Sequence, residues 1–353
     1  MRSTAFLILC SYVSAIRILC VGETLFDGLP SGIFLGGAPL NAAVHLAEVG
    51  VEAAYASCVG NDRLGREARR RLDSRGVDTA LIRTTDEYET GFVEVDVDAN
   101  GDASYTFNTP AAWDYITNSD AIAKAAADAD AVVFGSLGSR AEASRAAIRA
   151  AASAAKFTVC DVNLRPPFVD DEIVVEATCD VDLLKLNDEE LLPLAEALRR
   201  QAPSADVDAA CEACAKVEPA VDDASDAGDD NAMASTIAKA AAAIGKAVSA
   251  SRVVVTRGSK GAVYCDEDGS AYTCGGFKPD AIADTVGAGD SFLAAMLASL
   301  LAEKAGPLDA LEAGCRCGAF VASRPGATPK HEKAVIASLE GGVARALKSE
   351  PVL

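Results

Sequence analysis

Asp284-Thr285-Val286-Gly287-Ala288-Gly289-Asp290-Ser291-Phe292 leads directly into the apolar stretch Leu293 to Ala302, where we expect a helix. Gly287 and Gly289 let the backbone approach a ligand, and the N–H groups of Gly287, Ala288 and Gly289 at the helix start form a hole for an anion. Asp290 lies in the first turn, where an ionised carboxylate can accept the proton of an attacking hydroxyl. The stretch predicts phosphoryl transfer to an alcohol, although a turn followed by a capping Asp290 would explain a lone Gly-x-Gly-Asp equally well.

The composition fits one large α/β domain with a small appendage. The chain has 353 residues, and half of them are apolar, which is enough for a sizeable core. The formal net charge of −20 argues against nucleic acid and anionic membranes as partners, because both are held mainly by Lys and Arg. ATP is also an anion, so its binding would depend on local donors such as the anion hole and on a divalent metal.

Histidines and cysteines give little sign of a metal site. His45 and His331 are the only two histidines, and each lies in a helical-looking segment without an obvious ligand partner. The eleven cysteines are odd in number and several lie in apolar runs, which indicates a reducing compartment, most simply the cytoplasm. The apolar residues 1–16 are either an extension of the first strand or a short signal or targeting segment.

Short β-rich runs alternate with helical stretches, which predicts βαβ units and a mainly parallel central sheet flanked by helices. The continuous apolar run Ala131 to Phe134 fits a strand that is buried on both faces. The alternating runs are Ile18 to Gly22, Asn41 to Val49, Ala53 to Val59, Arg63 to Arg75, Val132 to Gly135, Ala141 to Ala155, Thr158 to Asp161 and Leu183 to Leu186.

Two segments depart from this alternation. Residues 90–109 alternate apolar and polar side chains around Asn100-Gly101, which predicts a hairpin that residues 24–35 join in a small sheet. Residues 203–231 are rich in Asp and Ala, and we expect an acidic, largely disordered insertion. Cys211-x-x-Cys214 within it has the spacing of half a zinc site or a redox pair, but packing is the favoured interpretation without a second cysteine pair.

Two motifs carry a resemblance to a known family. The full string from Asp284 to Phe292 resembles the C-terminal signature of the ribokinase-like sugar kinases of the phosphofructokinase-B type, which include fructokinases and adenosine kinases. Gly36-Gly37-Ala38-Pro39-Leu40-Asn41 resembles the N-terminal signature in its fructokinase-like form. The resemblance runs from about Arg17 to Pro329. It implies a ribokinase-like fold over residues 17–348, with the small sheet as a lid.

The resemblance assigns a sugar-binding role to Gly36, Gly37, Asn41 and Asp27. Asp27 follows the first strand, where open α/β sheets bind ligands, although an Asx turn would also explain it. Arg165 follows another strand and would clamp the transferring phosphoryl group. Fructokinases usually carry proline where this chain has Val162, a difference that affects loop stiffness more than chemistry.

The resemblance also assigns the nucleotide and metal contacts. Glu190 would contact Mg²⁺ through water, although an Asn cap followed by acidic residues is also ordinary chemistry at a helix start. The residues assigned to ATP are Asn187, Thr256, Gly258 and Gly261, and those of an optional potassium site are the backbones of Asp284, Val286 and Gly326.

Together these features predict an ATP-dependent kinase for the primary hydroxyl of a small sugar, with fructose as the leading substrate. Ribose, a ketodeoxy acid such as ketodeoxygluconate, and a nucleoside stay open, because the lid contacts around Asn108 and Trp113 cannot be placed from the sequence. A catalytically silent, kinase-like scaffold is the alternative from another class. Lid strands often pair between subunits, which would allow a homodimer.

Overall fold

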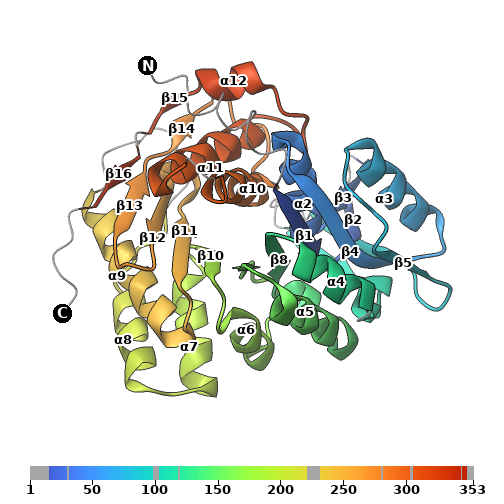
Figure 1. Ribbon diagram of the computed structural model, residues 1–353, viewed down its shortest axis with the longest axis horizontal. Coiled ribbons are helices and arrows are strands. Elements are labelled where there is room, and N and C mark those ends of the chain that lie inside the picture. The colour runs from blue at the N-terminus through green and yellow to red at the C-terminus, as the bar shows by residue number, and fades with distance from the viewer. Residues whose placement is uncertain are drawn as a thin grey trace.

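A ten-stranded, mainly parallel sheet runs through the middle of the molecule (Figure 1). The structure is a computed structural model that describes residues 16–29, 32–97, 103–117, 120–220, 231–279, 281–302, 305–342 and 344–347. In spatial order the strands are β16 (Arg345–Ala346), β13 (Ala271–Cys274), β12 (Ala262–Cys265), β11 (Arg252–Thr256), β10 (Leu183–Asn187), β9 (Thr158–Asp161), β8 (Ala131–Gly135), β1 (Arg17–Val21), β4 (Glu52–Gly60) and β5 (Ile82–Thr85). β12, β13 and β16 add antiparallel at one end, and the other neighbours pair in parallel, which confirms the expected sheet.

Helices cover both faces of this sheet, because successive side chains of a strand point to opposite sides. On β1, Ile18 and Cys20 face one core, and Leu19 and Val21 face the other. The first core is closed mainly by α2 (Ala38–Val49), α10 (Ala288–Leu300) and α11 (Pro307–Ala322), and the second by α4 (Asp120–Asp128), α5 (Glu142–Ala154), α6 (Asp171–Thr178), α7 (Leu191–Gln201), α8 (Ala205–Cys214) and α9 (Asn231–Val248). The predicted α/β class with flanking helices is confirmed.

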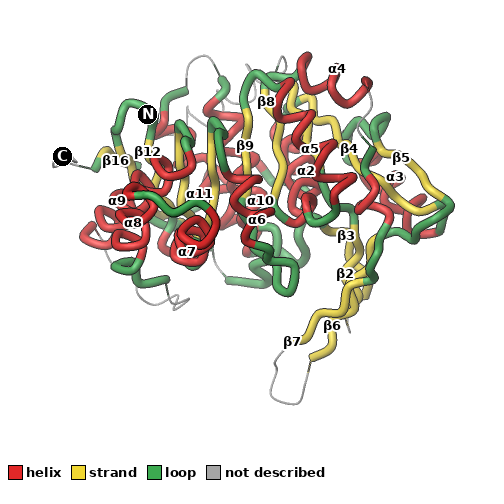
Figure 2. The backbone as a smooth tube through the Cα atoms, turned by 90° about the horizontal axis from the view of Figure 1, so that it is seen from below, coloured by secondary structure: helices red, strands yellow, loops and turns green. Residues whose placement is uncertain are grey.

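A second, four-stranded sheet projects from the main body (Figure 2). Its strands, in order, are β3 (Gly32–Gly36), β2 (Leu25–Leu29), β6 (Gly91–Val97) and β7 (Ala103–Phe107). β2 pairs in parallel with β6, so the segment after the first strand joins the later hairpin as expected. The expected turn at Asn100-Gly101 lies outside the described residues. Because β2 follows closely after β1, this small sheet is attached at the carboxyl edge of the main sheet.

The carboxyl ends of the parallel strands meet along that same edge. The register pairs Gly135 with Asp161 and Asp161 with Lys185, and it pairs Asn187 with Thr256. Residues from strands far apart in the sequence thereby lie in one row. Open α/β sheets bind ligands at this edge, so the fold alone places a site here.

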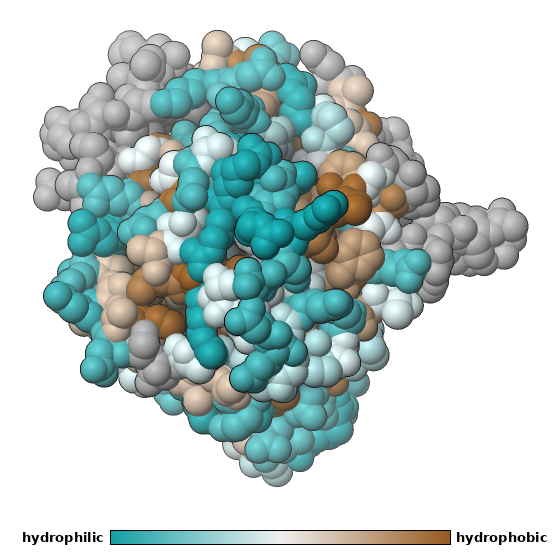
Figure 3. Space-filling view, turned by 90° about the vertical axis from the view of Figure 1, so that its right-hand side faces the viewer, coloured by the Kyte–Doolittle hydropathy of each residue, from teal (hydrophilic) through white to brown (hydrophobic). Residues whose placement is uncertain are grey.

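The helix α3 (Arg63–Ser74) lies at the side of the molecule that Figure 3 presents to the viewer. Asp62 caps its start, with Oδ1 accepting from the N–H of Gly65 at 2.7 Å. Gly65, Ala68 and Leu72 are its buried residues, and the space-filling view shows a largely hydrophilic surface on this side. The helix therefore packs mainly through one narrow stripe, and its exposed arginines are Arg63, Arg66 and Arg70.

The elements near the C-terminus are short. They are α12 (Lys333–Ser338) and a two-stranded sheet of β14 (Phe277–Lys278) and β15 (Glu340–Gly341). Across the part of the chain that the structure describes, we find no helix with the length and apolar character needed to cross a membrane.

The segment 203–231 differs from the disordered insertion that the composition predicts. Its first part forms α8, and Oγ of Ser204 caps the helix by accepting from the N–H of Val207 at 3.2 Å. The buried residues of α8 are Val207, Ala210, Cys211 and Cys214, which form one stripe against α7 and α9. The many aspartates conceal this stripe in the sequence. Residues 221–230 lie outside the described part of the chain.

We expect Cys211 and Cys214 to resist alkylation in the folded protein and to react after unfolding. Both thiols are free and buried, Cys211 donates to the carbonyl oxygen of Ala195 at 3.2 Å, and burial raises the pKa of Cys214 to about 12. Iodoacetamide labelling of native and denatured protein, read by peptide mass spectrometry, tests this. The half-buried Cys179 is the internal control and should label faster. Rapid labelling of Cys211 in folded protein would contradict the packing interpretation.

Candidate active site

The string that opens α10 forms a tight turn whose backbone fits the predicted anion hole. Gly287 adopts φ 77° and ψ −3°, the left-handed conformation that favours glycine. A Cβ atom at this position would lie 2.2 Å from the carbonyl oxygen of Ala327, so the turn has no room for a side chain. Among the described residues no side chain caps α10, which leaves the N–H of Gly289 free to face an anion.

Asp290, in the first turn of α10, is held by a residue from the other end of the chain. Nδ2 of Asn41 donates to Oδ2 of Asp290 at 2.8 Å. Asn41 is buried in the first turn of α2, and its Oδ1 has no hydrogen-bond partner among the described residues. Burial and, secondly, the carboxylate of Asp161 raise the pKa of Asp290 to about 6. Two of the predicted residues thus meet as a carboxylate and its orienting partner.

The start of α2 depends on a carboxylate that sequence reasoning missed. Gly37 has φ 123°, and a Cβ atom there would lie 2.2 Å from the carbonyl oxygen of Glu23. Oε1 of Glu23 accepts from the N–H of Ala38 at 2.8 Å and so caps the helix from another segment. Burial raises the pKa of Glu23 to about 7. The sequence did contain a signal for Glu23: it is a charged residue that closely follows a buried strand, and a buried charge needs a partner.

Asp27 and Arg165 approach the same place from two elements. A Cβ atom at Gly36 would lie 2.8 Å from Oδ2 of Asp27, so the carboxylate packs over this glycine. Burial raises the pKa of Asp27 to about 6, and the positive charge of Arg165 opposes this rise. Arg165 is exposed and has the same smaller, opposing effect on the pKa of Glu23 and of Asp290. The structure therefore gathers these predicted residues around one point.

A buried ion pair adjoins the glycine turn before α10. Nζ of Lys185 donates to both carboxylate oxygens of Asp161 at 2.9 Å. Nζ also lies 3.2 Å from the place that a Cβ atom of Gly289 would take. Burial alone would lower the pKa of Lys185, but Asp161 and two further carboxylates raise it, so the lysine carries its charge. Sequence reasoning missed Lys185, although a lysine inside the apolar run Leu183 to Leu186 was a signal.

Asn187 and Glu190 cap each other at the start of α7. Oδ1 of Asn187 accepts from the N–H of Glu190, and Oε2 of Glu190 accepts from the N–H of Asn187, both at 2.9 Å. Oε1 of Glu190 accepts from the N–H of Leu164 at 2.7 Å. Both oxygens of Glu190 are engaged with backbone, so a metal contact through water fits this carboxylate better than direct ligation.

Thr256, Gly258 and Gly261 lie at the next strand end. Thr256 pairs with Asn187 in the register of β10 and β11. Gly258 and Gly261 have φ of 49° and 88°. A Cβ atom at Gly261 would lie 2.0 Å from the carbonyl oxygen of Cys274, so the turn packs closely and depends on glycine. The role of this turn in nucleotide binding stays a prediction.

Asp284, Val286 and Gly326 come together around one side chain. Oδ1 of Asp284 accepts from the N–H of Val286 at 3.0 Å, and Oδ2 accepts from the N–H of Gly326 at 3.3 Å. The backbone segments expected at a potassium site are therefore adjacent. Potassium binding itself stays a prediction.

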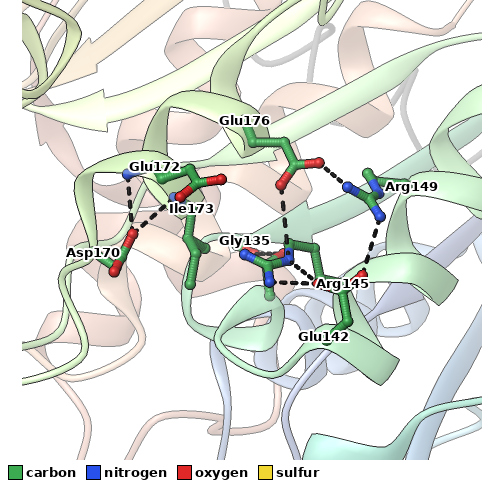
Figure 4. A network of polar contacts seen from close by, with 9 residues as sticks. Gly135, Glu142, Arg145, Arg149, Asp170, Glu172, Ile173 and Glu176 are labelled. Atoms are coloured by element: carbon green, nitrogen blue, oxygen red, sulfur yellow. Dashed lines mark hydrogen bonds and ion pairs between the residues drawn. The ribbon is translucent and has the colours of Figure 1, made fainter. Parts of the chain in front are cut away.

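A cavity of about 240 Å³ lies apart from these residues, between α5 and α6. Apolar side chains, among them Ile148 and Val181, line part of it. Figure 4 shows its polar side, where Arg149 forms an ion pair with Glu176 and Arg145 donates to Glu142 at 2.5 Å. These charges neutralise one another, and none of the candidate active-site residues described above lines the cavity.

Known proteins resemble this chain over most of its length. A profile of the pfkB family carbohydrate kinases matches residues 32–334. The chain is 27% identical over 300 residues to a fructokinase from Salmonella typhimurium, which covers 81% of this chain and 85% of that protein. It is 29% identical over 305 residues to a fructokinase from Vibrio alginolyticus, with 83% and 86% covered.

A solved structure shares the fold. A double mutant of the fructokinase from Vibrio cholerae O395, in its fructose, ADP and potassium ion bound form, matches with a TM-score of 0.68 at 23% identity, over 93% of this chain and 99% of that chain. This likeness confirms the expected ribokinase-like fold. Because the family profile spans both the glycine turn before α2 and the one before α10, the protein belongs to the pfkB family of carbohydrate kinases.

Proposed function

We propose that this carbohydrate kinase transfers a phosphoryl group from ATP to a primary hydroxyl of fructose, giving fructose 6-phosphate. The observation that carries the proposal is the half-buried Asp290, held by Asn41 at 2.8 Å directly beside the glycine turn of α10. The two fructokinase relatives, and the Vibrio cholerae structure that holds fructose and ADP, support this substrate and this donor.

Asp290 acts as the general base. Its Oδ2 accepts a hydrogen bond from Asn41, which fixes the carboxylate and leaves Oδ1 for the attacking hydroxyl. The hydroxyl proton moves to Oδ1 as the sugar oxygen bonds to the γ-phosphorus and the bond to ADP breaks. Because no covalent enzyme intermediate is needed, the protein contributes mainly position and charge.

Positive charge surrounds the place where the phosphoryl group would pass. The N–H groups of Gly287 and Gly289 would face its oxygens from the helix start, whereas the N–H of Ala288, which was expected to join them, already donates to the carbonyl oxygen of Thr285 at 3.2 Å. The charge of Lys185 lies behind Gly289, 3.2 Å from the place that a Cβ atom there would take, and Arg165 approaches from the exposed side. These groups stabilise negative charge on the transferring oxygens.

The sugar would lie between Asp27 and Asn41. The carboxylate of Asp27, packed over Gly36, accepts hydrogen bonds from sugar hydroxyls, and Gly37 lets the start of α2 approach closely. Oδ1 of Asn41, which has no partner among the described residues, is a further acceptor. A ligand without hydroxyls would leave the buried Asn41 and the half-buried Asp27 unpaired, which gives the site its preference for sugars.

The chain also offers fitting places for ATP and cations. The glycine turn at Gly258 and Gly261 would hold the nucleotide, together with Asn187 and Thr256. Glu190 would hold Mg²⁺ through water; when bound, this ion neutralises charge on the ATP phosphates. The adjacent backbones of Asp284, Val286 and Gly326 would hold K⁺, an ion present in the Vibrio cholerae structure.

Asp290→Asn should reduce turnover about a thousandfold while fructose still binds, because the amide cannot accept the hydroxyl proton. ADP release with Mg-ATP, measured against fructose, ribose, glucose, ketodeoxygluconate and adenosine, names the substrate, and calorimetry measures binding. Asp309→Asn is the matched control, because Asp309 is a first-turn aspartate of α11 that only caps its own helix. Full turnover by Asp290→Asn would refute the base assignment. If folded wild-type protein released no ADP with any substrate of the panel, this result would favour the scaffold alternative.

The pH dependence should follow the raised pKa of Asp290, about 6. The base works only when it is deprotonated. We therefore expect kcat/KM to be low at acid pH and to rise with pH through a midpoint near 6. Steady-state kinetics from about pH 5 to about pH 8 test this. Asp27 has a pKa in the same range, so Asp27→Asn is the control and should keep the midpoint. A shifted midpoint in that variant would reassign the titration.

Lys185→Met should lower kcat roughly a hundredfold, because it removes a charge behind the anion hole. It should also lower the melting temperature, because Asp161 is left buried and unpaired. The double variant Lys185→Met/Asp161→Asn should recover the melting temperature but not kcat. Calorimetry and steady-state kinetics on the three proteins separate the two effects. Recovery of both quantities would show that the pair is purely structural.

A further inference from the structure

Three successive backbone carbonyls near the C-terminus are held by side chains of two earlier helices. Nε2 of His45, on α2, lies 2.9 Å from the carbonyl oxygen of Ala327. Arg75, at the end of α3, donates through Nη1 to the carbonyl of Thr328 at 2.7 Å and through Nη2 to that of Pro329 at 3.3 Å. We call residues 327–329 the carbonyl loop.

The partners of His45 fix its tautomer. A carbonyl oxygen only accepts, so Nε2 of His45 carries the hydrogen and donates to Ala327. Nδ1 of the same ring is then an acceptor, and Nε2 of His331 donates to it at 2.9 Å. Burial is the main cause that lowers the pKa of His45 to about 3 and that of His331 to about 4, which agrees with two neutral rings. The sequence indicates no partner for either histidine, and the structure pairs them.

Further contacts tie this histidine pair to its surroundings. Glu48, one turn after His45 on α2, accepts from Nε of Arg75 at 2.8 Å and from the backbone N–H of His331 at 3.2 Å. Sγ of Cys317, on α11, lies 3.7 Å from Nε2 of His331. The carbonyl loop is therefore fixed to a rigid frame of α2, α3 and α11.

The carbonyl loop adjoins the anion hole. The carbonyl oxygen of Ala327 lies 2.2 Å from the place of a Cβ atom on Gly287, so the two backbones are in direct contact. Asn41 and His45 are four residues apart and share one face of α2. Asn41 holds Asp290, and His45 holds the loop that backs Gly287. Figure 1 shows α2 beside α10.

We propose that His45, with His331 as its partner, is a positioning residue for phosphoryl transfer. It holds the carbonyl loop against Gly287 and so fixes the N–H groups of the anion hole relative to Asp290. The inference rests on the proposed function for its kinetic consequence, but the link from His45 to the glycine turn is a property of the folded chain and can be tested without a substrate.

The test compares His45→Leu with His45→Gln. Leucine fills the volume but can neither donate nor accept, whereas glutamine can donate through Nε2 and accept through Oε1 and so is the matched control. Hydrogen–deuterium exchange of the peptide 284–292 reads the glycine turn directly. Steady-state kinetics read kcat and the KM for the sugar, with activity normalised to folded protein.

His45→Leu should exchange faster in the peptide 284–292 and should lose roughly tenfold in kcat with KM changed less than about twofold. His45→Gln should resemble wild type in both readouts. Unchanged exchange in His45→Leu, or an equal loss in both variants, would overturn the proposal. If His45 only stabilised the fold, His45→Leu would keep the kcat of wild type per folded molecule. An unchanged kcat in this variant would therefore also overturn the proposal. If wild-type protein turned over no sugar while the exchange difference persisted, the proposed function would fail, and the positioning role would fall with it.

Discussion

The hydrogen bond from Asn41 to Asp290 spans 249 residues of sequence and is the constraint on which the candidate site depends. It requires the first turns of α2 and α10 to meet, and the parallel sheet makes this possible by placing both helices on one face. Each helix start carries partial positive charge. Two such ends converge here in a protein whose formal net charge is −20. The fold therefore creates a local region of positive potential in a chain that is strongly negative overall.

The same place concentrates carboxylates that burial makes hard to ionise. The pKa values of Glu23, Asp27 and Asp290 rise to about 7, 6 and 6. Perturbed groups of this kind cluster at functional sites more often than elsewhere. Lys185 and Arg165 are the cations that balance them, one buried and one exposed. The candidate site therefore combines carboxylates whose pKa values are raised toward neutral pH with nearby positive charges, which fits the proposed base and the proposed phosphate contacts.

Local sequence pattern was enough to predict the sheet, its flanking helices and the small second sheet, because periodicity reports burial directly. It also placed Arg165 and Asn187 at strand ends, since parallel strands share one edge, whereas Asp27 lies within β2 of the small sheet. The sequence pattern could not predict which side chains pair across the fold. Nothing near Lys185 or His45 in the sequence names Asp161 or His331 as its partner.

The prediction of disorder was wrong for the first part of the acidic segment, where α8 forms, for another reason. Composition averages over both faces of a helix, and the aspartates of α8 outweighed its stripe of Val207, Ala210, Cys211 and Cys214. A test for helical period within an acidic region would have found the helix. The position of Glu23 after a buried strand indicated that it needs a partner, but its partner is a backbone N–H, which the sequence cannot identify.

The meeting of α2 with α10 has a consequence for biosynthesis. A ribosome delivers Asp27 and Asn41 long before Asp290, so the residues proposed to bind the sugar and the residue proposed as the base can meet only after α10 has been made. Domains generally fold as units during synthesis. A nascent or truncated chain that ends before α10 would lack both the proposed base and the helix against which α2 packs, so the candidate site can assemble only after the C-terminal elements have been made.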